Sequence, residues 1–161
     1  MKKSVVKVCV VLLAMAFLAV GCAGTQIVAT PQIPPECKGD QLEGFVSSGG
    51  PDIVTAAVVA GLIAVGIAEP AVAPAVKAGV RGAALVAYRA VQNGDMVAST
   101  SSLLDAINQI AKVKELEAFQ PAIILLTGLG KVEVTPCSKT VIGKLAKDIG
   151  IAAGADPGDF L

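Results

Sequence analysis

The chain has 161 residues, of which 54% are hydrophobic, 16% are charged and 3% are aromatic, and its formal net charge at pH 7 is +0. This apolar composition excludes an intrinsically disordered chain, and the lack of a basic excess argues against a nucleic-acid-binding protein. The sequence contains no His. It therefore lacks the commonest general base and a common zinc ligand.

The N-terminus has the pattern of a signal peptide. Residues 1–7 include three Lys and no acidic residue, and thirteen uncharged residues follow, from Val8 to Val20. A helix of that length spans roughly 20 Å, which is short of the ~30 Å hydrocarbon core of a membrane. We therefore predict a signal peptide over 1–21, with an uncleaved membrane anchor as the alternative.

The residues that end this leader, Leu18-Ala19-Val20-Gly21-Cys22, resemble the lipobox of bacterial lipoproteins. The resemblance covers only the first 22 residues. It implies cleavage before Cys22, a diacylglycerol on its thiol, and a fatty acid such as palmitate on its new amino group. Ala23 stands where an Asp tends to retain such proteins at the inner membrane of a Gram-negative host. The resemblance thus implies an outer-membrane lipoprotein, anchored by lipid and facing the periplasm.

Two cysteines remain once Cys9 is removed with the leader and Cys22 carries lipid. Export would place Cys37 and Cys137 in a compartment that permits disulfides. We predict that they form one bridge, and two separate buried thiols are the alternative. Two thiolates without His leave a tetrahedral metal shell half empty, so we expect no metal and no cofactor.

The mature chain divides by composition into three parts. Residues 22–50 are rich in Pro and Gly and are predicted to form the lipidated N-terminus and a tether. Residues 51–154 are predicted to form a helical domain. Residues 155–161 are predicted to be a polar C-terminal tail.

Two neighbouring helices are predicted at the start of the domain. The first covers 53–68, which is free of charge, and the second runs from Pro74 to Gln92 and ends at Asn93-Gly94. Small residues recur every four positions in both helices, at Ala56, Ala60, Ala64 and Ala68 and at Ala75, Gly79, Ala83 and Ala87. Facing strips of this kind predict a closely packed antiparallel hairpin.

This hairpin has two interpretations, a soluble core or a membrane hairpin that associates through its small residues. Sixteen residues give about 24 Å of helix, less than a bilayer needs. The second helix also carries Lys77, Arg81 and Arg89, which are costly in lipid. Length and charge therefore favour the soluble core.

The rest of the chain predicts further helices. After a polar link at 97–102, an amphipathic helix is expected from Ser102 to about Phe119, and a last helix from Ser138 to about Ala153. Residues 122–127 fit a short helix or a strand, and 131–135 alternate as a short β segment does. The predicted fold is mostly α, a small helical bundle around the hairpin.

No catalytic pattern emerges from the sequence. The Gly128-Leu129-Gly130-Lys131 run lacks the first Gly and the hydroxyl residue of a phosphate loop, and no Ser has a His to activate it. We therefore expect a non-enzymatic structural or accessory binding module that does not bind nucleic acid. Its expected contacts are the membrane, through the lipid, and a protein partner or a second copy. The alternative is a membrane-active or self-assembling component that uses the hairpin 53–92.

Overall fold

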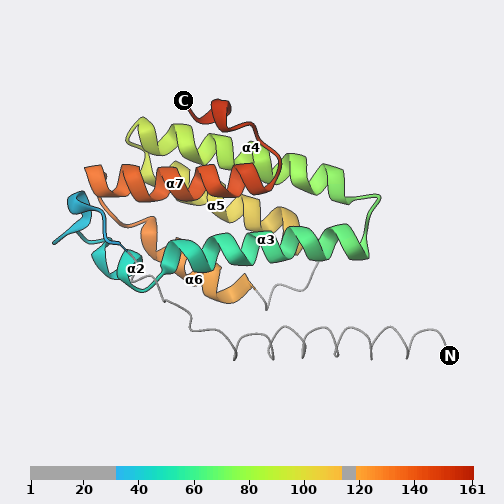
Figure 1. Ribbon diagram of the computed structural model, residues 1–161, viewed down its shortest axis with the longest axis horizontal. Coiled ribbons are helices and arrows are strands. Elements are labelled where there is room, and N and C mark those ends of the chain that lie inside the picture. The colour runs from blue at the N-terminus through green and yellow to red at the C-terminus, as the bar shows by residue number, and fades with distance from the viewer. Residues whose placement is uncertain (1–31, 114–118) are drawn as a thin grey trace. The chain divides into compact units, whose positions relative to one another are not determined.

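The computed structural model describes residues 32–113 and 119–161, and these form helices without any strand. The mostly α fold expected from the sequence, a small helical bundle, is confirmed (Figure 1). The α-helices are α2 (Glu43–Ser47), α3 (Gly50–Ala68), α4 (Ala73–Gln92), α5 (Met96–Ala111), α6 (Gln120–Leu129) and α7 (Pro136–Ala152), and two 3-10 turns are η1 (Pro35–Cys37) and η3 (Pro157–Phe160).

Helix α4 is the centre of the bundle, because α5 and α7 both pack closely against it. Its apolar stripe is buried and is made of Val76, Val80, Ala84, Ala87 and Val91. The opposite side carries exposed Lys and Arg side chains. The amphipathic pattern of α4 is thus satisfied within the domain.

Small residues set the distances at the two α4 contacts. A Cβ added to Gly79 would lie 3.1 Å from the Gln109 side chain of α5, and one added to Gly143 of α7 would lie 2.9 Å from Gln92 of α4. The hydroxyl of Ser99 donates a hydrogen bond across the α4–α5 contact to the carbonyl oxygen of Ala87, at 2.8 Å. The small side chain of Ala87 leaves that carbonyl within reach.

The prediction that strips of small residues on α3 and α4 face each other is wrong. Ala56, Ala60 and Ala68 are exposed, and Ala64 is half-buried. Helix α3 turns the opposite side inward, and that side is made of Val54, Val58, Gly61, Leu62 and Val65. Valine and leucine bury more apolar surface than alanine does, so they take the core in a helix that is apolar on every side.

The predicted polar link at 97–102 is wrong, because these residues lie inside α5. Asp95 caps the helix, accepting a hydrogen bond of 2.9 Å from the Ala98 amide. The hydroxyl of Thr100 donates to the carbonyl of Met96 and that of Ser102 to the carbonyl of Ala98, which keeps both compatible with a helix interior. The helix ends at Ala111, earlier than the predicted end near Phe119.

The short β segment expected at 131–135 is not formed. These residues make the turn between α6 and α7, and Thr135 caps α7 by exchanging hydrogen bonds with Ser138 in a capping box. No strand lies beside this segment within the described chain, so its alternating pattern has no ladder to join. Residues 122–127, compatible with helix or strand, belong to α6.

Part of the segment expected as a tether packs on the domain. Leu42 and Val46 are buried, and Cys37 is bonded to Cys137 at the start of α7, with 4.8 Å between their Cα atoms. The predicted disulfide is therefore present. The tail expected after residue 154 also packs, because η3 places Phe160 edge-on to Tyr88 with ring centroids 5.3 Å apart.

The glycines of α3 give a test of this packing. A Cβ at Gly61 would meet Ile110 and Phe119 at 2.7 Å, whereas one at Gly66 would meet no atom within 4 Å. Gly61→Ala is expected to lower the free energy of unfolding by about 1–3 kcal/mol through overpacking. Gly66→Ala is the control, expected to raise it by about 0.5–1 kcal/mol because alanine favours helix. Urea unfolding of both variants measures the difference, and equal effects would contradict the observed orientation of α3.

The disulfide gives a second test. It closes a loop with a sequence separation of 100, and the chain-entropy model assigns such a bridge about 4.7 kcal/mol. Reduction is therefore expected to lower the free energy of unfolding by about 4–5 kcal/mol, measured by urea unfolding with and without dithiothreitol. A Cys37→Ala, Cys137→Ala variant should match the reduced protein and be insensitive to reductant. A loss below about 1 kcal/mol would show that the bridge adds little to an already closed fold.

Candidate functional site

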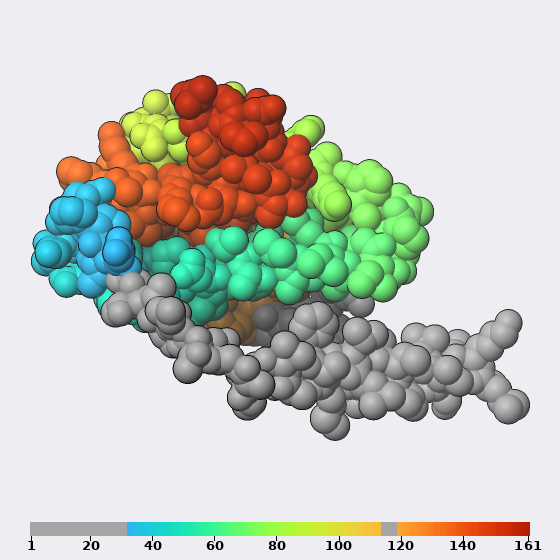
Figure 2. Space-filling view, in the orientation of Figure 1, coloured from blue at the N-terminus to red at the C-terminus, as the bar shows by residue number. Residues whose placement is uncertain are grey.

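The most unusual surface of the domain lies on α3. Its charge-free segment leaves Ile53, Ile63 and Ile67 exposed by 45%, 59% and 80%. Together with exposed Ala56 and Ala60 they form what we call the outer face of α3. Large exposed apolar patches on a folded domain mark contact surfaces. In Figure 2 the atoms of α3, teal to green, form a band along the visible side of the domain.

The residues of this outer face follow a regular spacing. They lie alternately three and four positions apart, from residue 53 to residue 67, which is the spacing of the contact line in a coiled coil. The core-facing residues of α3 lie on the other side of the helix. A second helix could thus contact the outer face without disturbing the core.

Helix α3 has 19 residues rather than the sixteen expected from the sequence, so the expectation that it is too short for a bilayer is wrong. By length and composition it could cross a membrane, and it is the one such helix in the part of the chain that is described. Only 28% of its most apolar stretch is buried, whereas the core helix of a soluble protein is mostly buried. Its inner residues nevertheless contribute to the same core as α5, α6 and α7. Spanning a bilayer would require α3 to leave that core.

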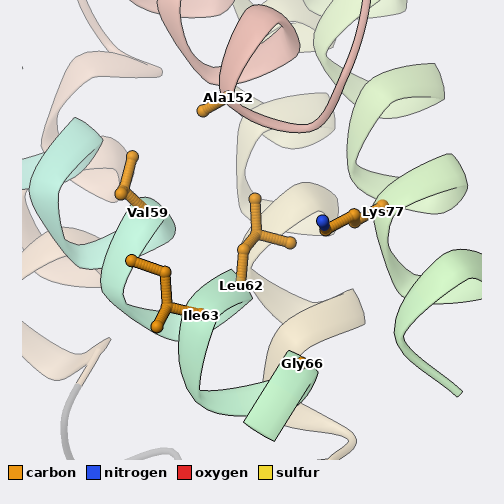
Figure 3. A pocket seen from close by; sticks show the side chains of 6 residues that line it. All are labelled: Val59, Leu62, Ile63, Gly66, Lys77 and Ala152. Carbon is orange, nitrogen blue, oxygen red and sulfur yellow. The ribbon is translucent and has the colours of Figure 1, made fainter. Parts of the chain in front are cut away.

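A short groove runs beside the outer face, between α3, α4 and α7 (Figure 3). Its volume is about 170 Å³, and it is lined by Val59, Leu62, Ile63, Gly66, Lys77 and Ala152. The ammonium of Lys77 points toward Leu62 at one wall. Ligand pockets for drug-sized molecules are usually about 300–1,000 Å³. The groove is therefore better described as the edge of the outer face than as a small-molecule site.

A second, open depression of about 400 Å³ lies on α5 and is lined by Asp105, Asn108, Gln109, Ala111 and Lys112. Its polar groups are those of a solvated helix surface. The residues with known placement contain no group of three or more His, Cys, Asp or Glu side chains arranged to hold a metal ion. The exposed Lys144–Asp148 pair on α7 is the one ion pair among them.

The sequence-predicted site residues are placed as follows. Cys22, the predicted lipidation site, lies outside the described residues. Cys37 and Cys137 meet in the disulfide. The sequence analysis does not predict the outer face of α3 as a contact surface. The lack of charge over 53–68 is the one sequence feature that points to it. That run does not reveal which side of the helix is buried.

Comparisons with protein-family models, with curated proteins and with solved structures found no match for this chain. The features of the chain that bear on its function are the lipobox-like run at 18–22, the disulfide and the outer face of α3.

Proposed function

We propose that this protein is a lipid-anchored lipoprotein of the cell envelope, held at the outer membrane and facing the periplasm, where it acts as a non-enzymatic binding module. The observation that carries the proposal is the sequence Leu18-Ala19-Val20-Gly21-Cys22 at the end of a basic and then apolar leader. Several acyl chains anchor a protein firmly, whereas one chain gives only marginal membrane binding.

Two features of the domain support the proposal. The Cys37–Cys137 disulfide fits an oxidising compartment outside the cytoplasm. The first element of the domain, η1, begins at Pro35, thirteen residues after Cys22. Thirteen residues span at most about 45 Å when fully extended. A lipid on Cys22 would therefore keep the domain close to the membrane surface.

The outer face of α3 supports a role in binding rather than catalysis. It offers exposed Ile and Ala side chains along a helix whose single charged residue is Asp52. Apolar area of this kind gains free energy when another surface covers it. The groove beside α3 and the depression on α5 are lined by no nucleophile paired with a base.

The second candidate function, a membrane-active or self-assembling component, draws support from α3 alone. The proposed hairpin 53–92 also includes α4, whose apolar stripe is buried against α5 and α7. Lys77, Arg81 and Arg89 are exposed on its other side. Any self-assembly therefore involves α3, not the hairpin as a unit.

Lipidation is tested with labelled fatty acid. The full chain expressed in a bacterial host is expected to incorporate the label, and Cys22→Ser is expected to lose all incorporation and keep its leader. Cys9→Ser is the matched control, because that Cys lies within the leader and should leave labelling unchanged. Mass spectrometry of the N-terminal peptide identifies the acylated residue. A wild-type protein without label would refute the proposed anchoring.

A further inference from the structure

We infer that the outer face of α3 binds the same face of a second copy of this chain, with the two α3 helices antiparallel. The inference names the partner of the binding module, and so rests on the proposed function. It starts from the three-and-four spacing of the outer face, which suits interlocking side chains between two helices.

Four of the five residues of the outer face match one another in an antiparallel register, and the fifth, Ile67, lies level with Gly49 just before α3 of the second copy. A twofold axis requires the same patch on both copies, so the residue sizes must match when the sequence is reversed. With the axis at the level of residue 58, Ile53 lies opposite Ile63 of the second copy, and Ala56 lies opposite Ala60 of the second copy. The Ala pairs bring the two backbones close at the centre, and the Ile pairs fill the wider space on either side.

The same register brings opposite charges together. Asp52, Val59 and Gly66 follow at seven-residue intervals, so they lie along one flank of the outer face. That flank borders the groove into which Lys77 points. The axis at residue 58 sets Asp52 of one copy level with residue 64 of the other, beside Lys77.

Both charges are available for this contact. Asp52 and Lys77 are exposed, and neither has an ion-pair partner among the residues that the structure describes. The twofold axis generates the Asp52–Lys77 contact twice. Exposed ion pairs add little affinity, but they select orientation and register. A parallel pair would place the two Asp52 side chains on opposite flanks and level with each other, so that neither would lie beside Lys77.

A membrane surface fits the outer face less well. Helices that lie on lipid carry Lys or Arg on the polar side and often Trp or Phe among the apolar residues. Helix α3 has none of these, and its centre is made of Ala, which inserts little apolar volume but allows a second backbone to approach. Two lipid anchors in the same membrane would also raise the effective concentration of one copy around another.

Photo-cross-linking in the membrane tests the contact on the full chain. A benzophenone amino acid replaces Ile63, and differently tagged copies are co-expressed. The expected product has twice the monomer mass and carries both tags. Ile124 on α6 is the matched control, since it is 68% exposed but lies off the outer face, and it should give no such product.

Other products at position 63 would overturn the inference. These are attachment to phospholipid, attachment to a different protein, or no cross-linked product at all. An equal yield of dimer from positions 63 and 124 would also overturn it. Formation of the Cys37–Cys137 bridge on a non-reducing gel confirms that each variant is folded.

A charge exchange then tests the register. Asp52→Lys or Lys77→Asp alone is expected to reduce the cross-linked dimer about fivefold or more, because each places two like-charge contacts in the interface. The double variant should recover the wild-type yield. Equal yields in all three would overturn the antiparallel register.

Fatty-acid labelling of the same samples separates this inference from the proposed function. A cross-linked dimer that carries no fatty-acid label would refute the lipid anchor but support the α3–α3 contact. Fatty-acid labelling without a cross-linked dimer would support the lipid anchor but refute the α3–α3 contact.

Discussion

The close approach of α4 to α5 and α7 is the contact on which the rest of the domain depends. Small residues permit it, because Ala84 and Ala87 have no exposed surface and Gly79 and Gly143 lie directly against side chains of the neighbouring helix. The approach also satisfies a buried polar group, since the Ser99 hydroxyl finds its acceptor on the α4 backbone. Tight packing around α4 thereby fixes the positions of α5 and α7. Helices α3 and α6 and the turn η1 pack in turn on these two helices.

Helix α3 packs on the outside of the unit that α4, α5 and α7 form. It contacts α7, α6 and α5 through one side only, with Gly61 seated against Ile110 and Phe119. The disulfide fixes η1 to α7, and α2 packs at the beginning of α3. Helix α2 thus covers the first residues of α3 and leaves the rest of its outer side exposed. The outer face is exposed because the described elements pack against the other side of α3.

Much of the fold could be predicted from the sequence, because helix ends and amphipathic stripes leave local signals. Asn93-Gly94 marked the end of α4, and the elimination of two cysteines predicted the bridge between the others. The orientation of α3 could not be predicted in this way, since an apolar helix has no stripe to indicate its buried side. The start of α5 was missed because a run of Ser and Thr resembles a loop, while its hydroxyls bond to the helix backbone.

The contact made by Phe160 has a consequence for the order in which this domain is completed. Its ring covers Gly150 so closely that a Cβ there would lie 2.3 Å from the Phe160 Cζ atom, which is a clash. The same ring also meets the ring of Tyr88, from the middle of the chain. Two contacts join segments that lie far apart in the sequence, because Cys37 bonds to Cys137 and Phe160 packs against Tyr88. The core is therefore complete only when both ends of the domain have joined it, so removal of η3 would uncover Gly150 and the Tyr88 ring.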